Sequence, residues 1–128
     1  MTPSLLLDTC VLLWILNGDK RITGNNEIMN LLNQTQRYFS PISVAEIEIK
    51  ASLGKLKIPG DYLDCIIESG IAEWPYRSSD AKALGNLPYH HKDPFDRMLI
   101  ASAVAHNLTI VTSDTVFSLY PITVIDVD

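Results

Sequence analysis

The chain lacks the surplus of basic residues that is typical of proteins that coat nucleic acid. Its 128 residues include 10 Lys and Arg against 15 Asp and Glu, which gives a formal net charge of −5. Neutralisation of phosphates supplies most of the non-specific affinity for nucleic acid, so bulk charge cannot hold such a ligand here. A nucleic-acid substrate would have to be attracted by a bound cation, a partner or a local basic patch.

Long hydrophobic runs and cysteines are also scarce. The longest apolar run, CVLLWIL at 10–16, is far too short to span a bilayer. The opening MTPSLLLDTC has no basic region and no small-residue cleavage site, so we expect no secretory signal. Cys10 and Cys65 both lie among apolar residues, and we expect two buried, reduced thiols rather than a disulfide. These features predict a cytoplasmic protein.

What is present is the composition of a folded domain. Hydrophobic residues make up 47% of the chain and charged residues 20%, which excludes disorder. At this length we expect a single domain over residues 1–128. Short strands are predicted at 4–8, 38–41, 71–75, 108–114 and 122–127. Helices are predicted at 9–17, 24–37, 43–54, 61–70, 78–85 and 94–106.

The predicted strands indicate the fold class. SLLLD at 4–8 and LTIVTSD at 108–114 are apolar runs without alternation, which is typical of strands buried on both faces. Such strands form parallel sheets covered by helices on each side. The sequence therefore predicts an α/β three-layer sandwich with a mostly parallel central sheet.

Acidic residues gather at one edge of this predicted sheet. The carboxyl ends of parallel strands and the amino ends of the adjoining helices share an edge, where ligands bind. Asp8 ends the first strand, Glu46 lies in the first turn of helix 43–54, and Asp114 follows the strand LTIVT. Asp93 and Asp96 lie at the start of the helix over 94–106.

Taken one at a time, most of these acids also have a purely structural interpretation. Ser43 and Glu46 fit a capping box, S-x-x-E, and Asp93 before Pro94 fits a helix N-cap. Asp8 could likewise be an N-cap and Asp114 a turn residue.

Asp96 differs from the other acids because of the helix face on which it lies. Leu99, Ile100 and Ala103 follow it at helical spacing, so its side chain is expected to point inward.

The convergence of the acids favours a metal site. Two carboxylates ~4 Å apart repel each other by about 4 kcal/mol at an effective dielectric constant of 20, so a cluster needs a counterion or raised pKa values. No cluster of His and Cys has metal-ligand spacing, and an all-oxygen site selects Mg²⁺ or Mn²⁺ over zinc. Water activated by such a cation would hydrolyse phosphodiesters. Neither a phosphate-binding glycine motif nor a G-x-S-x-G elbow is present.

The histidines are given smaller roles. His90 and His91 could act as a base or a metal ligand, but a solvated loop is the preferred interpretation. His106, at the end of a predicted helix, is interpreted as a partner of the helix dipole.

Four segments carry a resemblance to a known family. They are LLLDTCVLLWIL, SPISVAEIEIKASLGKL, HHKDPFDRMLIASAVAHNLTIVTSD and VIDV, and together they span nearly the whole chain. In their order and spacing they resemble the PIN-domain nucleases, and most of all the VapC-type toxins of prokaryotic toxin–antitoxin modules.

The resemblance implies a Mg²⁺- or Mn²⁺-dependent endoribonuclease that is inhibited by a cognate antitoxin and forms a homodimer. Asp8, Glu46 and Asp96 would be the main metal-organising acids, and Asp114 would complete the site. Asp93 would be either a further metal ligand or only the helix cap. Thr112 and Ser113 would orient the attacking water or a phosphate.

Three lysines and a tryptophan could form binding surfaces. Lys50, Lys55 and Lys57 form the best local basic patch for an RNA backbone, although charge at a helix end explains Lys50 and Lys55 equally well. Trp14 could be covered by a partner or belong to the core.

Other functions remain open. A DNA-directed nuclease or a phosphatase could use the same metal site, and a PIN-fold module could bind RNA or a partner without cleavage. A response-regulator receiver is excluded, because the first strand ends in the single Asp8 and no lysine lies near LTIVTSD.

Overall fold

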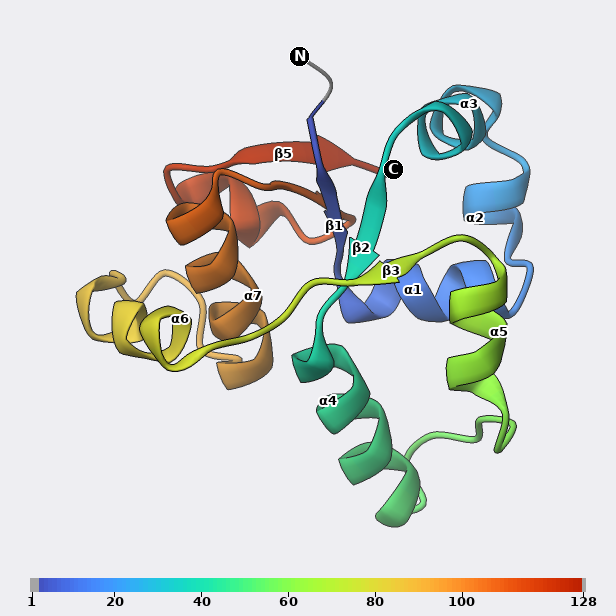
Figure 1. The fold of residues 1–128 in the computed structure, drawn as a ribbon, viewed down its shortest axis with the longest axis horizontal. Helices are drawn as coiled ribbons and strands as arrows, with labels where there is room; N and C mark the ends of the chain where they lie inside the picture. Colours follow the sequence, from blue (N-terminus) through green and yellow to red (C-terminus); the bar gives the residue numbers. More distant parts are fainter. Residues whose placement is uncertain (1–2, 128) are drawn as a thin grey trace.

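The centre of the molecule is a five-stranded sheet in which every pairing among the described residues is parallel. A computed structural model describes residues 3–127 (Figure 1). The strands are β1 (Leu5–Leu7), β2 (Arg37–Phe39), β3 (Ala72–Glu73), β4 (Thr109–Thr112) and β5 (Thr123–Asp126). Their order, β3-β2-β1-β4-β5, places β1 and β4 side by side in the middle. Both strands therefore carry their following residues to the same edge.

Helices cover both faces of the sheet. The helices of one face are α1 (Thr9–Leu16), α2 (Lys20–Thr23), α3 (Asn26–Gln34), α4 (Pro41–Ser52) and α5 (Tyr62–Glu68). The other face carries α6 (Ser78–Ala83), α7 (Pro94–His106) and the 3₁₀ helices η1 (Leu84–Asn86) and η2 (Thr115–Leu119). Leu5 and Leu7 belong to the core on the first side, and Leu6 belongs to the core on the second. The predicted three-layer α/β sandwich is confirmed.

The start of α4 differs from the prediction. Ser40 is its N-cap and accepts a hydrogen bond from the Ile42 amide at 3.0 Å, with Pro41 at the first helical position. The predicted capping box is wrong, because a serine followed by proline starts the helix earlier. Ser43 is instead buried and accepts a hydrogen bond from the Thr9 hydroxyl at 2.8 Å. Glu46 therefore lies in the second turn, where it caps nothing.

The start of α7 follows the prediction. Asp93 Oδ1 accepts hydrogen bonds from the amides of Phe95 and Asp96, at 2.8 and 3.2 Å, and Pro94 comes next. This cap places Asp96 in the first turn of the helix, on the side of the sheet's carboxyl edge.

The segment between β1 and β2 was predicted less well. The helix expected over 24–37 is α3, and Arg37 already belongs to β2. The four-residue α2 was not predicted, because its formation depends on the Asp19 cap, whose side chain accepts from the Arg21 amide, rather than on apolar periodicity.

The expectation that both cysteines are buried is wrong. Cys10 and Cys65 are both exposed: Cys10 lines a cleft at the start of α1, and Cys65 lies on α5, where only Tyr62 and Ile66 are buried.

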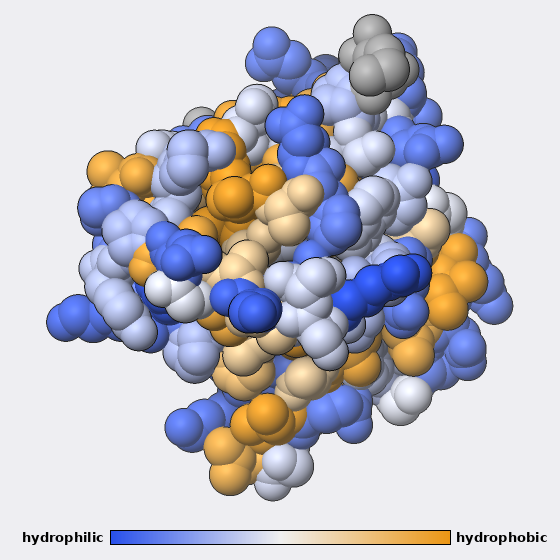
Figure 2. All heavy atoms as spheres, turned by 60° about the vertical axis from the view of Figure 1, so that its left-hand side comes forward, coloured by the Kyte–Doolittle hydropathy of each residue, from blue (hydrophilic) through white to orange (hydrophobic). Residues whose placement is uncertain are grey.

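Among the helices of residues 3–127, none is both long and apolar enough to cross a bilayer. On the face that Figure 2 shows, apolar residues lie in separate patches among hydrophilic ones.

Candidate metal centre

All five acids predicted from the sequence line one cleft of about 350 Å³. They are Asp8, Glu46, Asp93, Asp96 and Asp114. The cleft lies where β1 ends and α1 begins, where β4 ends and where α7 begins, and α4 also lines it. The structure therefore brings together residues from four separate parts of the chain.

Asp8 is the most firmly held of these acids. It caps α1, with Oδ1 accepting from the Val11 amide at 2.8 Å, and Oδ2 accepts from the Thr112 hydroxyl at 2.5 Å. Only 4% of the residue is exposed. Burial raises the pKa of Asp8 to about 6, although the two hydrogen bonds oppose this shift. The structural and functional interpretations of Asp8 thus coexist in one side chain.

Glu46 has an unsatisfied oxygen. Oε2 accepts from the Lys50 ammonium at 2.5 Å, but Oε1 is buried and has no hydrogen-bond partner among residues 3–127. Buried polar atoms in proteins nearly always have a partner. An unpartnered, buried carboxylate oxygen beside Asp8 is therefore a position suited to a cation.

Asp96 is half-buried and close to other acids. Burial is the main reason why the pKa of Asp96 rises to about 7, and the negative charge of Asp93 raises it further. The nearby His91 acts in the opposite direction. A carboxyl group with this pKa is only partly ionised near neutrality unless a cation enters the cleft.

Asp93 and Asp114 combine structural bonds with a place in the cleft. Asp114 Oδ1 accepts from the Val116 amide at 3.0 Å and so caps η2, while Asp93 caps α7 as described. The Asp114 amide donates to Thr112 Oγ1 at 3.0 Å. Thr112 thus links Asp8 to Asp114, and Ser113 also lines the cleft.

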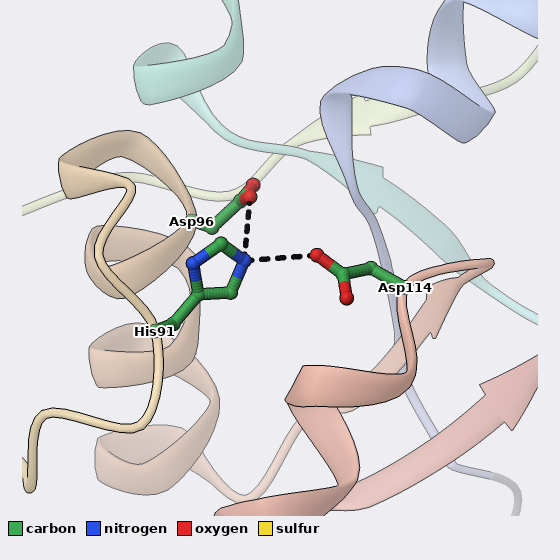
Figure 3. Close-up of side chains that lie close together, drawn as sticks. All are labelled: His91, Asp96 and Asp114. Atoms are coloured by element: carbon green, nitrogen blue, oxygen red, sulfur yellow. Dashed lines mark hydrogen bonds and ion pairs between the residues drawn. The ribbon is translucent and has the colours of Figure 1, made fainter.

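His91 is the neighbour of the acids whose position the sequence prediction gave wrongly. Figure 3 shows its imidazole between Asp96 and Asp114, with Nε2 at 3.0 and 2.9 Å from their Oδ2 atoms. The ring also packs edge-on against Phe117, with 5.6 Å between ring centres. Its side chain is 13% exposed, so the solvated-loop interpretation is wrong. The position of His91 two residues before the Asp93 cap was the one sequence signal that it lies near the acids. Its contact with Asp114, which is 23 residues away in the chain, could not be read from a local pattern.

The donor set fits a hard divalent cation. Ligand atoms of His91, Asp96 and Asp114 all lie within 4.8 Å of one another, and the carboxylates of Asp8 and Glu46 line the same cleft. Carboxylate oxygens are the ligands that Mg²⁺ and Mn²⁺ prefer. A larger cavity of about 510 Å³ lies at the opposite edge of β1 and β4, where His106 is the one titratable residue of the described lining. The acidic cleft is therefore the candidate site.

The family model of the PIN domain matches residues 5–122. The chain belongs to the PIN-domain family, whose members are nucleases. This confirms the family resemblance predicted from the sequence. None of the curated proteins compared with the chain matches it by sequence.

Several solved structures have a fold similar to that of this PIN domain. VapBC2 from Rickettsia felis, bound to a DNA fragment from its promoter, is similar with a TM-score of 0.73 and 18% identity, covering 96% of this chain and 98% of the other. DNA-bound VapBC from Salmonella typhimurium is similar with a TM-score of 0.70 and 23% identity, and the match covers 100% of both chains. FitAcB from Neisseria gonorrhoeae is similar with a TM-score of 0.63 and 22% identity, and the match covers 96% of this chain and 97% of the other. At these identities the similarity shows a shared fold.

The three lysines of the predicted basic patch lie in different places in the PIN domain. Lys50 lines the cleft and pairs with Glu46, which raises the pKa of Lys50 through their hydrogen bond. Lys55 and Lys57 are exposed beyond the end of α4.

Trp14 and His106 also occupy defined positions. Trp14 is partly buried against the core and has the Arg21 guanidinium 4.3 Å above its ring. His106 is more than a dipole partner, because its Nε2 lies 2.7 Å from the fully buried Asp80 carboxylate and ties α7 to α6.

Proposed function

We propose that this PIN domain is a Mg²⁺- or Mn²⁺-dependent endoribonuclease. The observation that carries the proposal is the buried, unpartnered Glu46 Oε1 in a cleft where burial also raises the pKa values of Asp8 and Asp96. An acidic cluster of this kind is stabilised by a divalent cation, which also attracts a phosphate that the chain's net charge of −5 would repel.

The chain's own residues have distinct roles in this proposal. Asp8, Glu46 and Asp96 would hold the cation, and Asp114 and Asp93 would complete the acidic surround. When bound, the cation supplies Lewis acidity and a water of lowered pKa for attack on phosphorus. The Val11 amide and the Thr112 hydroxyl hold the Asp8 carboxylate in a fixed orientation. Ser113 at the rim of the cleft offers a hydroxyl to a phosphate oxygen or to the attacking water.

We further propose that the protein is the toxin of a toxin–antitoxin pair, acts as one domain over its 128 residues, and forms a homodimer. The sequence resemblance to VapC-type toxins supports this, as do the similar folds in the VapBC and FitAcB complexes. An antitoxin would restrain RNA cleavage in the cell. Expression without a partner is therefore expected to arrest growth, and co-expression with the protein encoded beside it is expected to relieve the arrest. Light scattering on the purified protein measures the number of chains.

The decisive experiment is cleavage of RNA by purified protein, freed of any co-purifying partner, with Mn²⁺, Mg²⁺ or EDTA. The Asp96→Asn variant, prepared identically, removes a charge at nearly constant shape and controls for contaminating ribonuclease. We expect metal-dependent cleavage in the wild type and at least a hundredfold loss in the variant. Full activity of both proteins would contradict the site assignment.

The same assay separates the alternatives. Matched RNA and DNA oligonucleotides distinguish a ribonuclease from a DNA nuclease, because discrimination depends on shape and on contacts to the 2′-hydroxyl. Metal-dependent binding of RNA without cleavage of any RNA or DNA would favour a binding module.

A further inference from the structure

His91 lies between two acids of the cleft, Asp96 and Asp114, without being an acid itself. It comes from the segment before α7, and Figure 3 shows both of its carboxylate contacts meeting at one ring nitrogen, Nε2. Two chemical interpretations fit this position. His91 is either a metal ligand beside Asp96 and Asp114, or a hydrogen-bond donor that holds these two carboxylates.

The other ring nitrogen distinguishes the two interpretations. The backbone amide of Asp93 donates a hydrogen bond to His91 Nδ1 at 3.1 Å. A nitrogen that accepts a hydrogen bond carries no proton, so the proton of the neutral imidazole lies on Nε2. An N–H at Nε2 can donate to the Oδ2 atoms of Asp96 and Asp114, but it has no lone pair for a metal. Ligation through Nε2 would require a proton on Nδ1, directly against the Asp93 amide.

The segment that carries His91 is held independently of the acids. The Tyr120 hydroxyl accepts from the His91 amide at 2.9 Å and donates to the Pro88 carbonyl at 2.8 Å. The buried Arg97 guanidinium donates to the same Pro88 carbonyl at 2.9 Å. Because Arg97 belongs to α7, the imidazole and Asp96 are fixed to the same helix. The ring position is therefore set by the fold rather than by the carboxylates.

Asp114 needs such a donor more than Asp96 does. It lies in the turn after β4, its side chain is 38% exposed, and its Oδ1 accepts a hydrogen bond from the Val116 amide, two residues along the chain. Without a shared donor, mutual repulsion would favour separation of the Asp96 and Asp114 carboxylates.

We propose that His91 is a positioning residue of the metal centre: its Nε2–H donates to Asp96 and Asp114 and keeps their carboxylates at a separation ready for a divalent cation. This inference rests on the proposed metal site and extends it to a residue outside the acidic set. Groups that orient metal ligands in this way typically contribute 10–100-fold to metal affinity.

The first test is the affinity for Mn²⁺, measured by titration calorimetry without RNA. His91→Leu, which removes the donor, is expected to weaken binding about 10–100-fold. His91→Gln, whose side-chain amide can place an N–H near the position of Nε2, is expected to retain most of the affinity. His90→Leu is the matched control and is expected to match the wild type, because His90 is exposed and contacts the Tyr120 ring rather than the acids.

The second test reads the proton directly and does not depend on any variant folding. Long-range ¹H–¹⁵N spectra of histidine-labelled wild type are expected to show the Nε2–H form of His91, both metal-free and with Mg²⁺. A proton on Nδ1 in either state would overturn the proposal, as would equal losses of Mn²⁺ affinity in His91→Leu and His91→Gln, or no loss in His91→Leu. A protein that binds Mn²⁺ as expected but does not cleave RNA would contradict the nuclease function and leave this inference standing.

Discussion

The carboxyl group of Asp8 shows how one residue serves both the fold and the site. Its hydrogen bonds from the Val11 amide and the Thr112 hydroxyl favour the charged form, yet burial outweighs them and raises the pKa of Asp8 to about 6. The ionised form is therefore destabilised in the folded protein when no cation is near. An asparagine can keep the same cap without the charge.

This gives a prediction for stability against pH in EDTA. With a folded-state pKa of about 6 and an ordinary value of 3.8, Asp8 binds more protons in the folded than in the unfolded state between these values. Its contribution to the free energy of unfolding is present below about pH 4 and is lost as the pH rises towards 7. Asp8→Asn should therefore be the more stable protein at pH 7, by up to ~3 kcal/mol. Urea unfolding of both proteins from pH 4 to pH 8 measures the difference.

Conditions free of Mg²⁺ and Mn²⁺ are essential for this comparison, because a bound cation stabilises the charged Asp8 carboxylate and would reverse the sign of the stability difference. An Asp8→Asn variant that is less stable than the wild type at pH 7 in EDTA would contradict the burial argument.

At the scale of elements, α7 organises the cleft through Arg97. This side chain is 7% exposed and donates to the carbonyls of Pro88, Leu87 and Leu84, at 2.9, 3.4 and 3.5 Å. Its guanidinium also lies 4.0 Å from the centre of the Tyr89 ring. Arg97 thereby attaches the segment ahead of the helix to the helix itself.

Replacing Arg97 should release that segment. Arg97→Met keeps much of the aliphatic length but removes the hydrogen bonds of Arg97 to three carbonyls, including that of the buried Leu87, so we expect a loss of about 2–4 kcal/mol in the free energy of unfolding. Mn²⁺ affinity should fall as well, because His91 lies on the released segment. Arg77→Met, at an exposed arginine, is the control and should stay within about 0.5 kcal/mol of the wild type. An unchanged urea midpoint for Arg97→Met would refute this role.

For the whole molecule, the distribution of charge matters more than its sum. The net charge of −5 opposes binding of nucleic acid, while the acidic cleft concentrates part of that charge at one edge of the sheet. A cation that binds there stabilises the fold and attracts phosphate through a single event.

Mg²⁺ should therefore raise the melting temperature of the wild type. A ligand at 100 times its dissociation constant stabilises the folded state by about 2.7 kcal/mol. Calorimetric melting with increasing Mg²⁺ measures this shift, which Asp96→Asn should largely remove. Asp64→Asn, at an exposed acid on α5, should keep it. Identical shifts in all three proteins would mean that Mg²⁺ acts elsewhere on the surface.

Much of the site follows from local patterns. Apolar runs without alternation identify the buried parallel strands, and Asp8 and Asp114 are found because each comes where such a strand ends. The Asp93–Pro94 helix start is equally readable, because capping depends on residues that are neighbours in the chain. The PIN-domain resemblance depends on the same segments.

The remainder depends on contacts between distant residues. Thr112 meets Asp8 across 104 positions of sequence, and His91 meets Asp114 across 23. No local pattern encodes either pair. His91 was therefore predicted to lie in a solvated loop, and Thr112 was predicted to orient the attacking water or a phosphate rather than to bind Asp8.

Local sequence patterns were enough to predict the fold class, the family and the edge at which the acids gather, because apolar strand patterns and helix caps depend on residues that are close in the chain. Three features became visible only in the folded chain: Glu46 Oε1 is buried without a partner among residues 3–127, Cys10 is exposed, and His91 lies between two carboxylates. Burial and long-range hydrogen bonds depend on how the layers pack, and they decide what each acid can do.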